Sequence, residues 1–421
     1  FYFCSEIKGI LRVNKDIQIN SDIVKFYLNT SFYDSFEETF YKDILQVEQG
    51  TYIIFDLNKK NFNKKRYWDL NDDKNLNNSF ELFDQHLTNS FSIQQRSDTK
   101  IGVNVSSGVD SNLMISYLNL INKGQNNILA NSYYFSDPEY DYRKDLNDMS
   151  QNYGWKINCH EIKSQDIIEN FEEVSNFQDE PFPGIVTIAK HILIKKSYPS
   201  DCKVILEGQG GDEAAGGYKY IYPLYILDLI KKFKFSKAFN EVKDFKIIEN
   251  IDNKEFYSYF INSLKGYFYG GVSADGTKSN SEGLFLFSSS KNHQMYKIIL
   301  KKIAQNKSFL KRIIYRDIFY CKLPRILRSC DRASMAYSKE LRVPLLDHNI
   351  VNFLFSIDNN KMINKGILRD YYRNFALEKF KHNKYIKQKK YYVSDPQTKW
   401  LKTSLFNWMY DILTSKSLHI E

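Results

Sequence analysis

The sequence predicts an α/β fold, with a doubly wound parallel sheet followed by a largely helical C-terminal half. Short apolar runs of strand length alternate with helix-like segments between residues 101 and 206, as in parallel strands joined by helical crossovers. After Tyr218 the periodicity is mainly helical. Because such sheets bind ligands at the carboxyl ends of their strands, the residues after each apolar run are the first candidates for a site.

The front of the chain is expected to be β-rich over residues 1–70. A strand is predicted at 51–55, after Gly50, and a second extended piece at 66–68. A polar stretch at 69–78 is typical of a linker. We therefore place a first domain at residues 1–75 and a second at 76–421.

The second domain begins with helical periodicity at 80–91. A Gly/Ser-rich piece at 266–290 is predicted to be a long loop. The strands of the sheet are predicted at 101–105, 128–135, 157–162 and 203–206.

The most informative stretch runs from Val105 to Ser111, where a Ser/Gly turn joins the first strand to a helix-like segment at 112–121. The first turn of a helix has unpaired N–H donors and a partial positive charge, so this arrangement holds phosphate. Asp110 makes sense in an anion site if a magnesium ion bridges it to the phosphates. These residues predict a MgATP site.

A second glycine turn supports this interpretation. The strand at 203–206 leads into Glu207, Gly208 and Gln209, and Asp212 follows. Glycine permits tight turns and close approach of a ligand, and a strand end is where a second metal-binding carboxylate belongs. Each motif alone is weak, but the two in this order, roughly 100 residues apart, are specific.

Composition bounds the classes of function. With 43% hydrophobic and 16% aromatic residues the chain is globular, and no apolar run is long enough to span a membrane. The net charge of +9 suggests nucleic-acid binding, but the lysines are spread widely and the run at 231–237 is typical of a solvated helix face. We expect neither a nucleic-acid nor a membrane partner.

Five scattered cysteines without a CxxC pair indicate reduced thiols in a cytoplasmic protein. The seven histidines show no metal spacing. The sequence shows no signal peptide and no initiator Met, so we expect part of the front end to be missing.

With both glycine turns placed, the chain resembles the asparagine synthetase family, specifically its ATP-pyrophosphatase (PP-loop) synthetase domain. The family's Ser-Gly-Gly-x-Asp-Ser loop is matched by 106–111, and its Ser-Gly-Glu-Gly-x-Asp-Glu turn by 207–213. Further matches are Asp179 to Phe182, Gly216 to Tyr218, Asp331 to Ala336, Glu340 to His348, and Lys387 to Lys389.

The front of the chain resembles the end of the family's class II glutamine amidotransferase domain, an N-terminal nucleophile glutaminase. Residues 3–8, 49–52 and 66–68 carry this resemblance. The nucleophile of that domain is an N-terminal cysteine, which this sequence does not show, and Cys4 is expected to be a small core residue. The chain as given is therefore not expected to hydrolyse glutamine.

The resemblance implies an ATP-dependent amide-forming ligase of the asparagine synthase (glutamine-hydrolysing) type. An acceptor carboxylate, by default aspartate, would attack the α-phosphate of ATP and release pyrophosphate, and ammonia, normally from glutamine, would then displace AMP. Asp110 and Asp212 would hold Mg²⁺, and Lys389 would stabilise charge on the α-phosphate. The residues that would bind ATP are Val105, Ser106, Ser107, Gly108, Asp110, Ser111, Tyr134, Glu207 and Gly208.

Several of these residues also have structural interpretations. Asp110 and Asp212 could cap a helix or form a turn, and Tyr134 and Phe135 could pack a strand instead of flanking adenine. Lys389 stands in a lysine run that is typical of a solvated surface.

Other charged residues are more ambiguous. The charged residues between 331 and 342 are expected to form a salt-bridge network. Asp179 and Glu180 either shape the substrate pocket or cap a helix.

Two departures from the family's pattern matter. Ser107 replaces a glycine, which costs roughly 1 kcal/mol or more if that position needs a positive φ. Gln209 replaces the glutamate assigned as general base toward ammonia, and an amide cannot accept a proton at neutral pH. Gln209 would then orient the nucleophile, and the base would be another group such as Glu207.

Three rival functions stay open. One is a paralogue that amidates another carboxylate, such as a sugar acid of a surface polysaccharide. Another is a degenerate nucleotide-binding protein, against which the presence of Asp110 and Asp212 argues. The third is an ATP-pyrophosphatase that modifies tRNA, which would need an RNA-binding module that we do not find. The sequence also leaves the oligomeric state open, a homodimer included.

Overall fold

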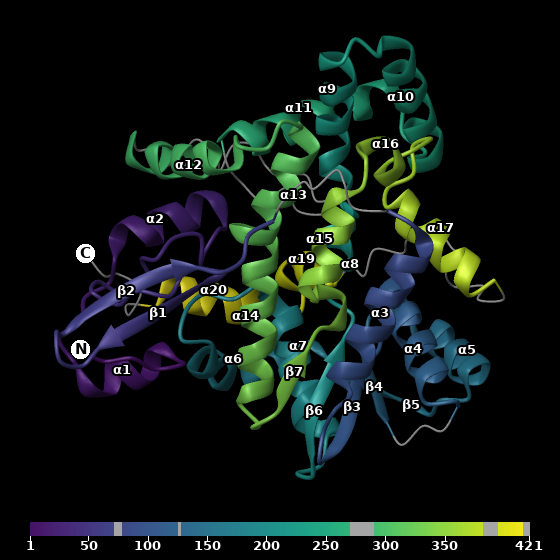
Figure 1. Ribbon diagram of the computed structural model, residues 1–421. Coiled ribbons are helices and arrows are strands. Elements are labelled where there is room, and N and C mark those ends of the chain that lie inside the picture. The colour runs from purple at the N-terminus through teal and green to yellow at the C-terminus, as the bar shows by residue number, and fades with distance from the viewer. Residues whose placement is uncertain (71–77, 125–127, 270–289, 382–394, 416–421) are drawn as a thin grey trace. The chain divides into compact units, whose positions relative to one another are not determined.

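The computed structural model describes residues 1–70, 78–124, 128–269, 290–381 and 395–415 (Figure 1). The chain divides into two compact units. Unit 1 comprises Phe1–His86, Gly210–Arg325 and Leu346–Lys379, and unit 2 comprises Leu87–Gln209, Ile326–Leu345 and Phe380–Glu421. The domain boundary near residue 75 stays a prediction.

Unit 2 is built on a five-stranded parallel sheet with the strand order β5-β4-β3-β6-β7 (Figure 1). The four predicted strands are confirmed, and the short edge strand β7 joins them. The bounds are β3 Lys100–Asn104, β4 Leu129–Phe135, β5 Ile157–Ile162, β6 Cys202–Glu207 and β7 Glu340–Arg342.

The path of the chain through this sheet makes it doubly wound. The chain runs outward from β3 through β4 to β5 and then returns to β6 on the other side of β3. Because such crossovers are right-handed, the helices of the outward path, α4 (Val109–Ile121) and α5 (Arg143–Tyr153), cover one face. The helices of the return path, α6 (Ser164–Gln178) and α7 (Gly184–Ser197), cover the other. The reversal places a ligand-binding switch point between β3 and β6.

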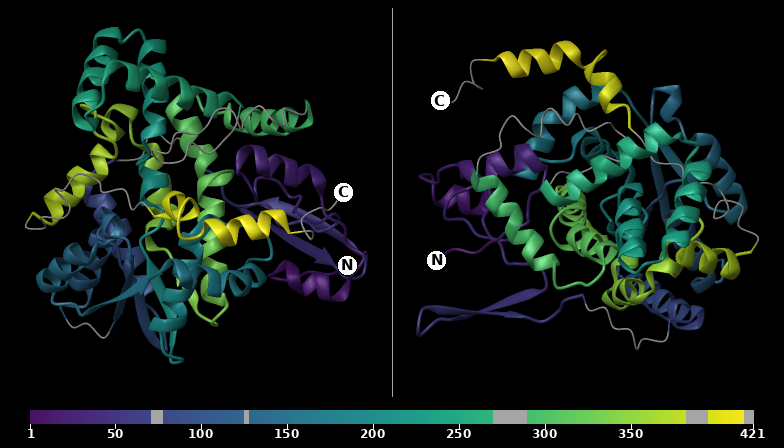
Figure 2. Two further views of the ribbon diagram at one scale, coloured as in Figure 1. Left: turned by 180° about the vertical axis from the view of Figure 1, so that it is seen from behind. Right: turned by 90° about the horizontal axis from the view of Figure 1, so that it is seen from above.

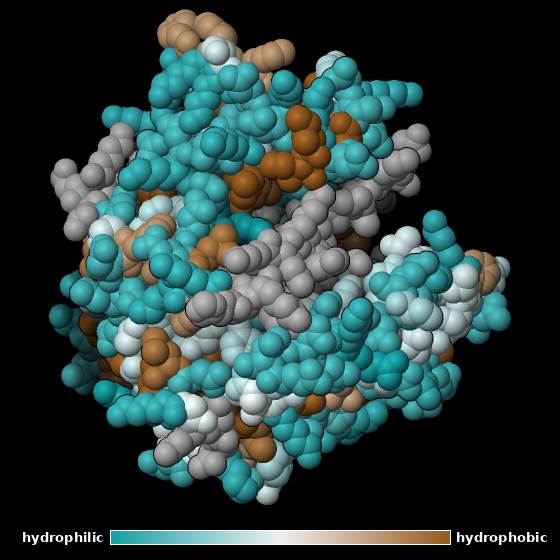
Figure 3. All heavy atoms as spheres, turned by 90° about the vertical axis from the view of Figure 1, so that its right-hand side faces the viewer, coloured by the Kyte–Doolittle hydropathy of each residue, from teal (hydrophilic) through white to brown (hydrophobic). Residues whose placement is uncertain are grey.

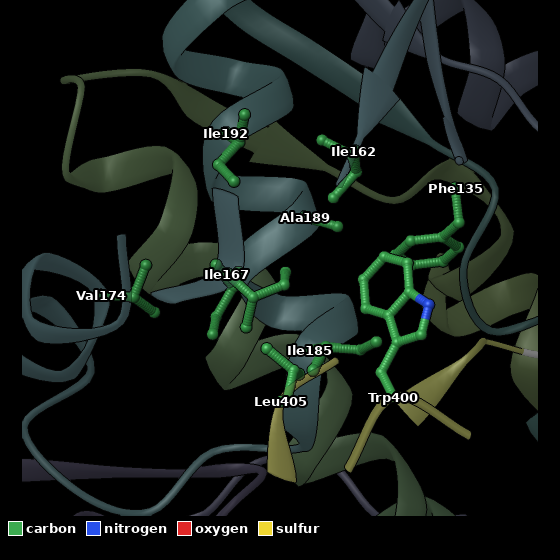
Figure 4. Packing of buried hydrophobic residues seen from close by; sticks show 10 residues of the cluster. Phe135, Ile162, Ile167, Val174, Ile185, Ala189, Ile192, Trp400 and Leu405 are labelled. Atoms are coloured by element: carbon green, nitrogen blue, oxygen red, sulfur yellow. The ribbon is translucent and has the colours of Figure 1, made fainter. Parts of the chain in front are cut away.

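Helix α7 is held on the sheet by an apolar cluster (Figure 4). Four of its apolar residues follow the i, i+3, i+4, i+7 spacing of one helix face. Trp400 of α19 (Gln397–Leu401) meets Phe135 edge to face, with ring centroids 5.5 Å apart. The buried members are Phe135, Ile162, Ile167, Val174, Ile185, Ile188, Ala189, Ile192, Trp400 and Leu405.

The front segment of unit 1 contains helices as well as the predicted strand. Helices α1 (Ile7–Val13) and α2 (Ser21–Thr30) precede a hairpin of β1 (Thr51–Asp56) and β2 (Asn61–Arg66), seen as a long ribbon in Figure 2. The buried residues of α2 are Ile23, Phe26 and Thr30, which follow one another at spacings of three and four residues. This is a helical period within a segment that was expected to be β-rich. The second extended piece ends at Arg66, earlier than predicted.

The expectation that Cys4 is a core residue is wrong. Cys4 is exposed, and so are its neighbours at the very start of the chain. A terminal segment that packs against little gives a small apolar side chain nothing to be buried in.

After Tyr218 the chain is mainly helical, as predicted. Helix α3 (Phe80–Gln94) confirms the helix expected at 80–91, and both α3 and α14 (Lys322–Met335) contribute residues to both units. The remaining helices of unit 1 include α8 Gly211–Ala215, α9 Tyr222–Lys231, α10 Phe235–Glu249, α11 Asn253–Tyr269, α12 Ser290–Ile303, α13 Phe309–Phe319, α15 His348–Ser356, α16 Asn359–Met362 and α17 Asp370–Lys379. In unit 2, α20 Phe406–Thr414 follows α19.

Two local predictions need correction. The loop predicted from residue 266 begins later, because α11 continues to Tyr269 with Tyr267 buried, and residues 270–289 lie outside the described residues. The basic run at 231–237 is exposed but is not one helix face. It is the junction of α9 and α10, where Phe233 has a left-handed φ of 56° that ends the first helix.

One face of the molecular surface, drawn in Figure 3, is mostly hydrophilic, and its apolar side chains lie in separate small groups. Within the part of the chain that the structure describes, no helix has the length and apolarity needed to cross a membrane.

Candidate functional site

The first part of the site is the β3–α4 turn, residues 105–108. The backbone N–H and the hydroxyl of Ser106 both hydrogen-bond to the hydroxyl of Ser111, at 3.1 and 2.9 Å. Gly108 is the N-cap of α4, and no side chain among the described residues caps the helix there. The N–H donors of a first helical turn are the groups that bind an anion in such a position.

The backbone of this turn is unstrained. Ser107 is not among the residues with positive φ, so the strain that serine would cause in a left-handed backbone does not arise. Gly108 has a φ of −69°, and a Cβ added there would meet only the Ser106 hydroxyl, at 3.4 Å. Gly108 is therefore not needed for backbone freedom, and its lack of a side chain leaves room at the helix start.

Asn112, which the sequence analysis missed, holds the turn from inside α4. Its fully buried side-chain amide donates to the carbonyl oxygens of Ser107 and Gly108, at 3.2 and 2.9 Å. The available signal was a polar residue in an otherwise apolar helical stretch. Val105 is also fixed, because its N–H donates to the Asn131 carbonyl at 2.9 Å.

The end of β6 lies beside this turn. Asn104 and Glu207, the last residues of β3 and β6, are paired in the sheet register. A Cβ added to Gly208 would lie 3.2 Å from the carbonyl carbon of Asp110 and 3.3 Å from the nitrogen of Ser111. The structure thus brings the two glycine motifs into contact at the switch point, and glycine at 208 permits that approach.

Glu207 belongs to a buried ion pair. The Lys190 ammonium of α7 lies 2.7 Å from Oε1 of Glu207 and donates to the sulfur of Cys330, on α14, at 3.0 Å. Burial by itself lowers the pKa of Lys190, but the Glu207 carboxylate and the hydrogen bond to Cys330 outweigh it and hold that pKa above its ordinary value. Burial raises the pKa of the Cys330 thiol to about 11, so this thiol is neutral near pH 7. Sequence reasoning had not connected Lys190 or Cys330 with the site.

The two aromatic residues at the end of β4 differ. Phe135 is buried in the cluster under α7, so it packs the strand and does not flank a ligand. Tyr134 is half-buried, and the Arg143 guanidinium lies over its ring, 4.2 Å from the centroid. A role for Tyr134 beside adenine stays a prediction.

Asp212 lies in α8 of unit 1, where its carboxylate forms an ion pair with Arg369. Asp110 belongs to unit 2, and the pairing of the two carboxylates around one metal ion stays a prediction. Beside Asp212, burial first and the Asp212 charge second raise the pKa of Glu213 to about 7, and the Tyr218 hydroxyl donates to Glu213. No motif singled out Arg369.

The other charged candidates have structural partners. Glu340 and Arg342 form the expected salt bridge, 2.9 Å apart, in β7. Asp179 caps the C-terminal end of α6 with a φ of 64°, while Glu180 is buried and paired with Arg328 of α14.

Two further residues were predicted for the site. Gln209 follows Gly208 and is half-buried at the end of a unit 2 segment. Lys389 lies outside the described residues, so its role stays a prediction. No group of three or more His, Cys, Asp or Glu side chains suited to a metal occurs in the described ranges, so a bound magnesium would take further ligands from phosphate and water.

Comparison with known proteins points to one family. The asparagine synthase family model matches residues 82–421. The chain is 30% identical over 244 residues to "Putative asparagine synthetase (glutamine-hydrolyzing) 2" of Methanocaldococcus jannaschii, a match covering 55% of this chain and 45% of that protein. It is 21% identical over 425 residues to asparagine synthetase (glutamine-hydrolyzing) 1 of Bacillus subtilis, covering 98% of this chain and 65% of that protein.

The chain thus spans between 45% and 65% of the length of these two relatives. Among solved structures, a U34-tRNA thiolase, NcsA, from Methanococcus maripaludis matches 57% of this chain and 80% of its own, with 14% identity. Its TM-score of 0.26 is too low to support any argument. On the family match, which extends over most of the sequence and contains both motifs of the switch point, the chain belongs to the asparagine synthase family.

Proposed function

We propose that this chain is an ATP-dependent amide-forming ligase. It adenylates a carboxylate, by default aspartate, with release of pyrophosphate, and then transfers ammonia to the acyl group to give the amide and AMP. The observation that carries the proposal is the contact of Gly208 with the first turn of α4, at the switch point between β3 and β6. Parallel α/β sheets bind their ligands there.

The β3–α4 turn supplies the phosphate site in this proposal. The uncapped N–H groups of α4 and the linked hydroxyls of Ser106 and Ser111 bind the pyrophosphate end of ATP. Val105, Gly208 and the backbone of Glu207 lie along the adenosine, while the Glu207 side chain is turned to Lys190. The turn is already held by Asn112 in the ligand-free protein, which lowers the ordering cost of binding.

Asp110 and Asp212 are the proposed magnesium ligands. Carboxylate oxygens are the donors that Mg²⁺ prefers, and Asp110 stands in the first turn of α4, beside the proposed phosphate site. Asp212 forms an ion pair with Arg369, and its carboxylate oxygens are donors of the same kind. When bound, Mg²⁺ offsets the negative charge of the leaving pyrophosphate. Lys389 is proposed to stabilise charge on the α-phosphate.

A second acceptor class deserves a test. Glu207 and Gln209 depart from the Ser-Gly-Glu of the family turn, next to the proposed site of chemistry. A sugar acid of a surface polysaccharide is therefore the alternative to aspartate.

The test is pyrophosphate release from MgATP and ammonium chloride, with L-aspartate and D-galacturonate supplied in parallel. We expect release that depends on one of these acceptors, with an equal amount of amide detected by mass spectrometry. Asp110→Ala should abolish release, whereas Asp145→Ala, which removes an acidic residue from the first turn of α5, should not. MgATP binding without release for either acceptor would contradict both acceptor assignments.

A further inference from the structure

The carboxylate at the end of β6 has a position and a surrounding that the phosphate site does not explain. We propose that Glu207 binds the ammonia nucleophile and accepts its proton, the task that the family pattern places at position 209. This inference rests on the proposed function, because it assigns a residue to its second step.

Glu207 is the last residue of β6, and it is followed directly by Gly208, where a Cβ would lie 3.2–3.3 Å from backbone atoms of Asp110 and Ser111. The backbone at this position is therefore next to the turn proposed to hold the phosphates, and the side chain of Glu207 is turned to Lys190 of α7. The sequence supplies a carboxylate at 207 where the family turn has serine, and an amide at 209 where it has glutamate. The two departures together keep one carboxylate in the turn.

The two oxygens of the Glu207 carboxylate have different surroundings. Oε1 of Glu207 is held by Lys190 at 2.7 Å, whereas Oε2 is buried and has no hydrogen-bond partner among the described residues. Glu207 is only 8% exposed. A buried acceptor without a donor costs about 1–3 kcal/mol, so a ligand that donates N–H to Oε2 removes a penalty present in the ligand-free protein.

The groups that surround the Lys190–Glu207 pair differ in their ability to accept a proton. Cys330 has a pKa of about 11, and burial raises the pKa of Tyr133 as well, so both hold their protons near neutral pH. His191, the next residue to Lys190 on α7, is already hydrogen-bonded to the Tyr337 hydroxyl at 2.6 Å. Lys190 is protonated and can only donate. Apart from Nδ1 of His191, whose ring packs against Phe177 and Tyr337, Oε2 of Glu207 is the buried acceptor without a partner among the described groups around this pair.

In the proposed second step, ammonia displaces AMP from the acyl-adenylate. The nitrogen lone pair of ammonia attacks the acyl carbon of the acyl-adenylate, and a C–N bond forms. The C–O bond to AMP breaks, and its electron pair leaves on the phosphate oxygen. One N–H proton passes to Oε2 of Glu207 and later to solvent. Lys190 stays protonated throughout and positions the carboxylate by its bond to Oε1.

The experiment separates the two half-reactions in the full chain. Acceptor-dependent exchange of pyrophosphate into ATP reports adenylation, and amide formation from ammonium chloride reports the second step. The acceptor is whichever of L-aspartate and D-galacturonate supports exchange in the wild type. Glu207→Gln keeps a hydrogen-bonding side chain beside Lys190 but removes the basic oxygen. Glu207→Asp keeps the charge and draws the carboxylate back by one methylene.

We expect both variants to keep exchange within about twofold and to lose amide formation from ammonia by roughly 100-fold or more, the scale of general base catalysis. Hydroxylamine needs less help with its proton, so its use should fall far less. The double variant E207Q/Q209E should recover at least about tenfold of the lost rate, because it returns a carboxylate to the turn. Asp201→Asn is the control, since Asp201 is paired with Lys100 at 2.8 Å at the opposite end of β6.

The outcomes are distinguishable. Wild-type protein without acceptor-dependent exchange would end the proposed function and this inference with it. Exchange and amide formation that both stay at the wild-type level in Glu207→Gln would overturn the inference alone. Loss of exchange together with amide formation in folded Glu207→Asp would also overturn it, because the pair would then serve ATP or acceptor binding. If Glu207→Gln does not fold, Glu207→Asp decides.

Discussion

Gly108 and Gly208 lie on the two turns of the site and are glycines for different reasons. Gly208 is packed against backbone atoms of Asp110 and Ser111 at distances that a methyl group would tighten to 3.2–3.3 Å. Gly108 has ordinary helix-start dihedrals and open space on most sides. The protein therefore needs glycine at 208 to keep its own structure, and at 108 to leave room for a ligand.

This difference predicts opposite phenotypes for two alanine variants. Gly208→Ala should lower the free energy of unfolding by about 1–3 kcal/mol, because the backbone it meets cannot rotate away. Gly108→Ala should change it by about 1 kcal/mol or less and yet weaken MgATP binding at least about tenfold. Urea unfolding and calorimetric titration measure the two quantities. Equal losses of stability in the two variants would contradict the difference in packing between Gly208 and Gly108.

Among the elements, α7 positions the proposed base, because its Lys190 pairs with Glu207 at the end of β6. Its apolar stripe is covered by Trp400 and Leu405, which come from a segment far along the chain (Figure 4). The position of Lys190 thus depends on a contact between α7 and α19.

Trp400→Ala should destabilise the protein by about 3–5 kcal/mol, since it leaves a cavity against Phe135 and α7. Phe406→Ala is the matched control, because Phe406 begins α20 nearby and is 48% exposed. It should cost about 0.5 kcal/mol or less. Thermal unfolding of both variants gives the comparison, and similar losses for both would contradict the assigned packing.

Much of the sheet was predictable from local pattern. The runs that became β3, β4, β5 and β6 are short, apolar and bounded by turn residues, so their periodicity is enough. β7 was missed because three residues, two of them charged, carry no such signal. α1 and α2 were missed because a segment thought to resemble the end of a β-rich domain was expected to be strands throughout.

The site was predictable only in part. The β3–α4 turn and the Gly208 turn carry their function in local sequence, because phosphate binding uses consecutive backbone N–H groups. The partners of Glu207 do not, because Lys190 and Cys330 come from α7 and α14 and meet only in the folded sheet. Asn112 likewise needed the structure to show that its amide holds the turn.

At the scale of the whole molecule, the five thiols report on the fold. All five cysteines are free; Cys202, Cys321 and Cys330 are buried, and Cys4 is exposed. Burial raises the pKa of Cys321 to about 12 and that of Cys330 to about 11. Since the thiolate is the reactive form, raising the pKa lowers the reactive fraction at any pH below it.

A thiol reagent at pH 8 should therefore label Cys4 rapidly in the native protein, while the three buried cysteines react only after unfolding in urea. Peptide mapping by mass spectrometry assigns each site. Cys4→Ser should remove the fast phase. Rapid labelling of Cys330 in the native state would show that the Lys190–Glu207 pair is open to solvent.

For the whole molecule, we propose that a carboxylate is activated as an acyl-adenylate at the switch point. The most direct measurement uses an acceptor with its carboxylate labelled with ¹⁸O, MgATP and ammonium chloride, followed by mass spectrometry of the nucleotide product. Adenylation predicts that one ¹⁸O atom is transferred into AMP and that the pyrophosphate is unlabelled. ADP with the label in inorganic phosphate, or AMP without label, would contradict it.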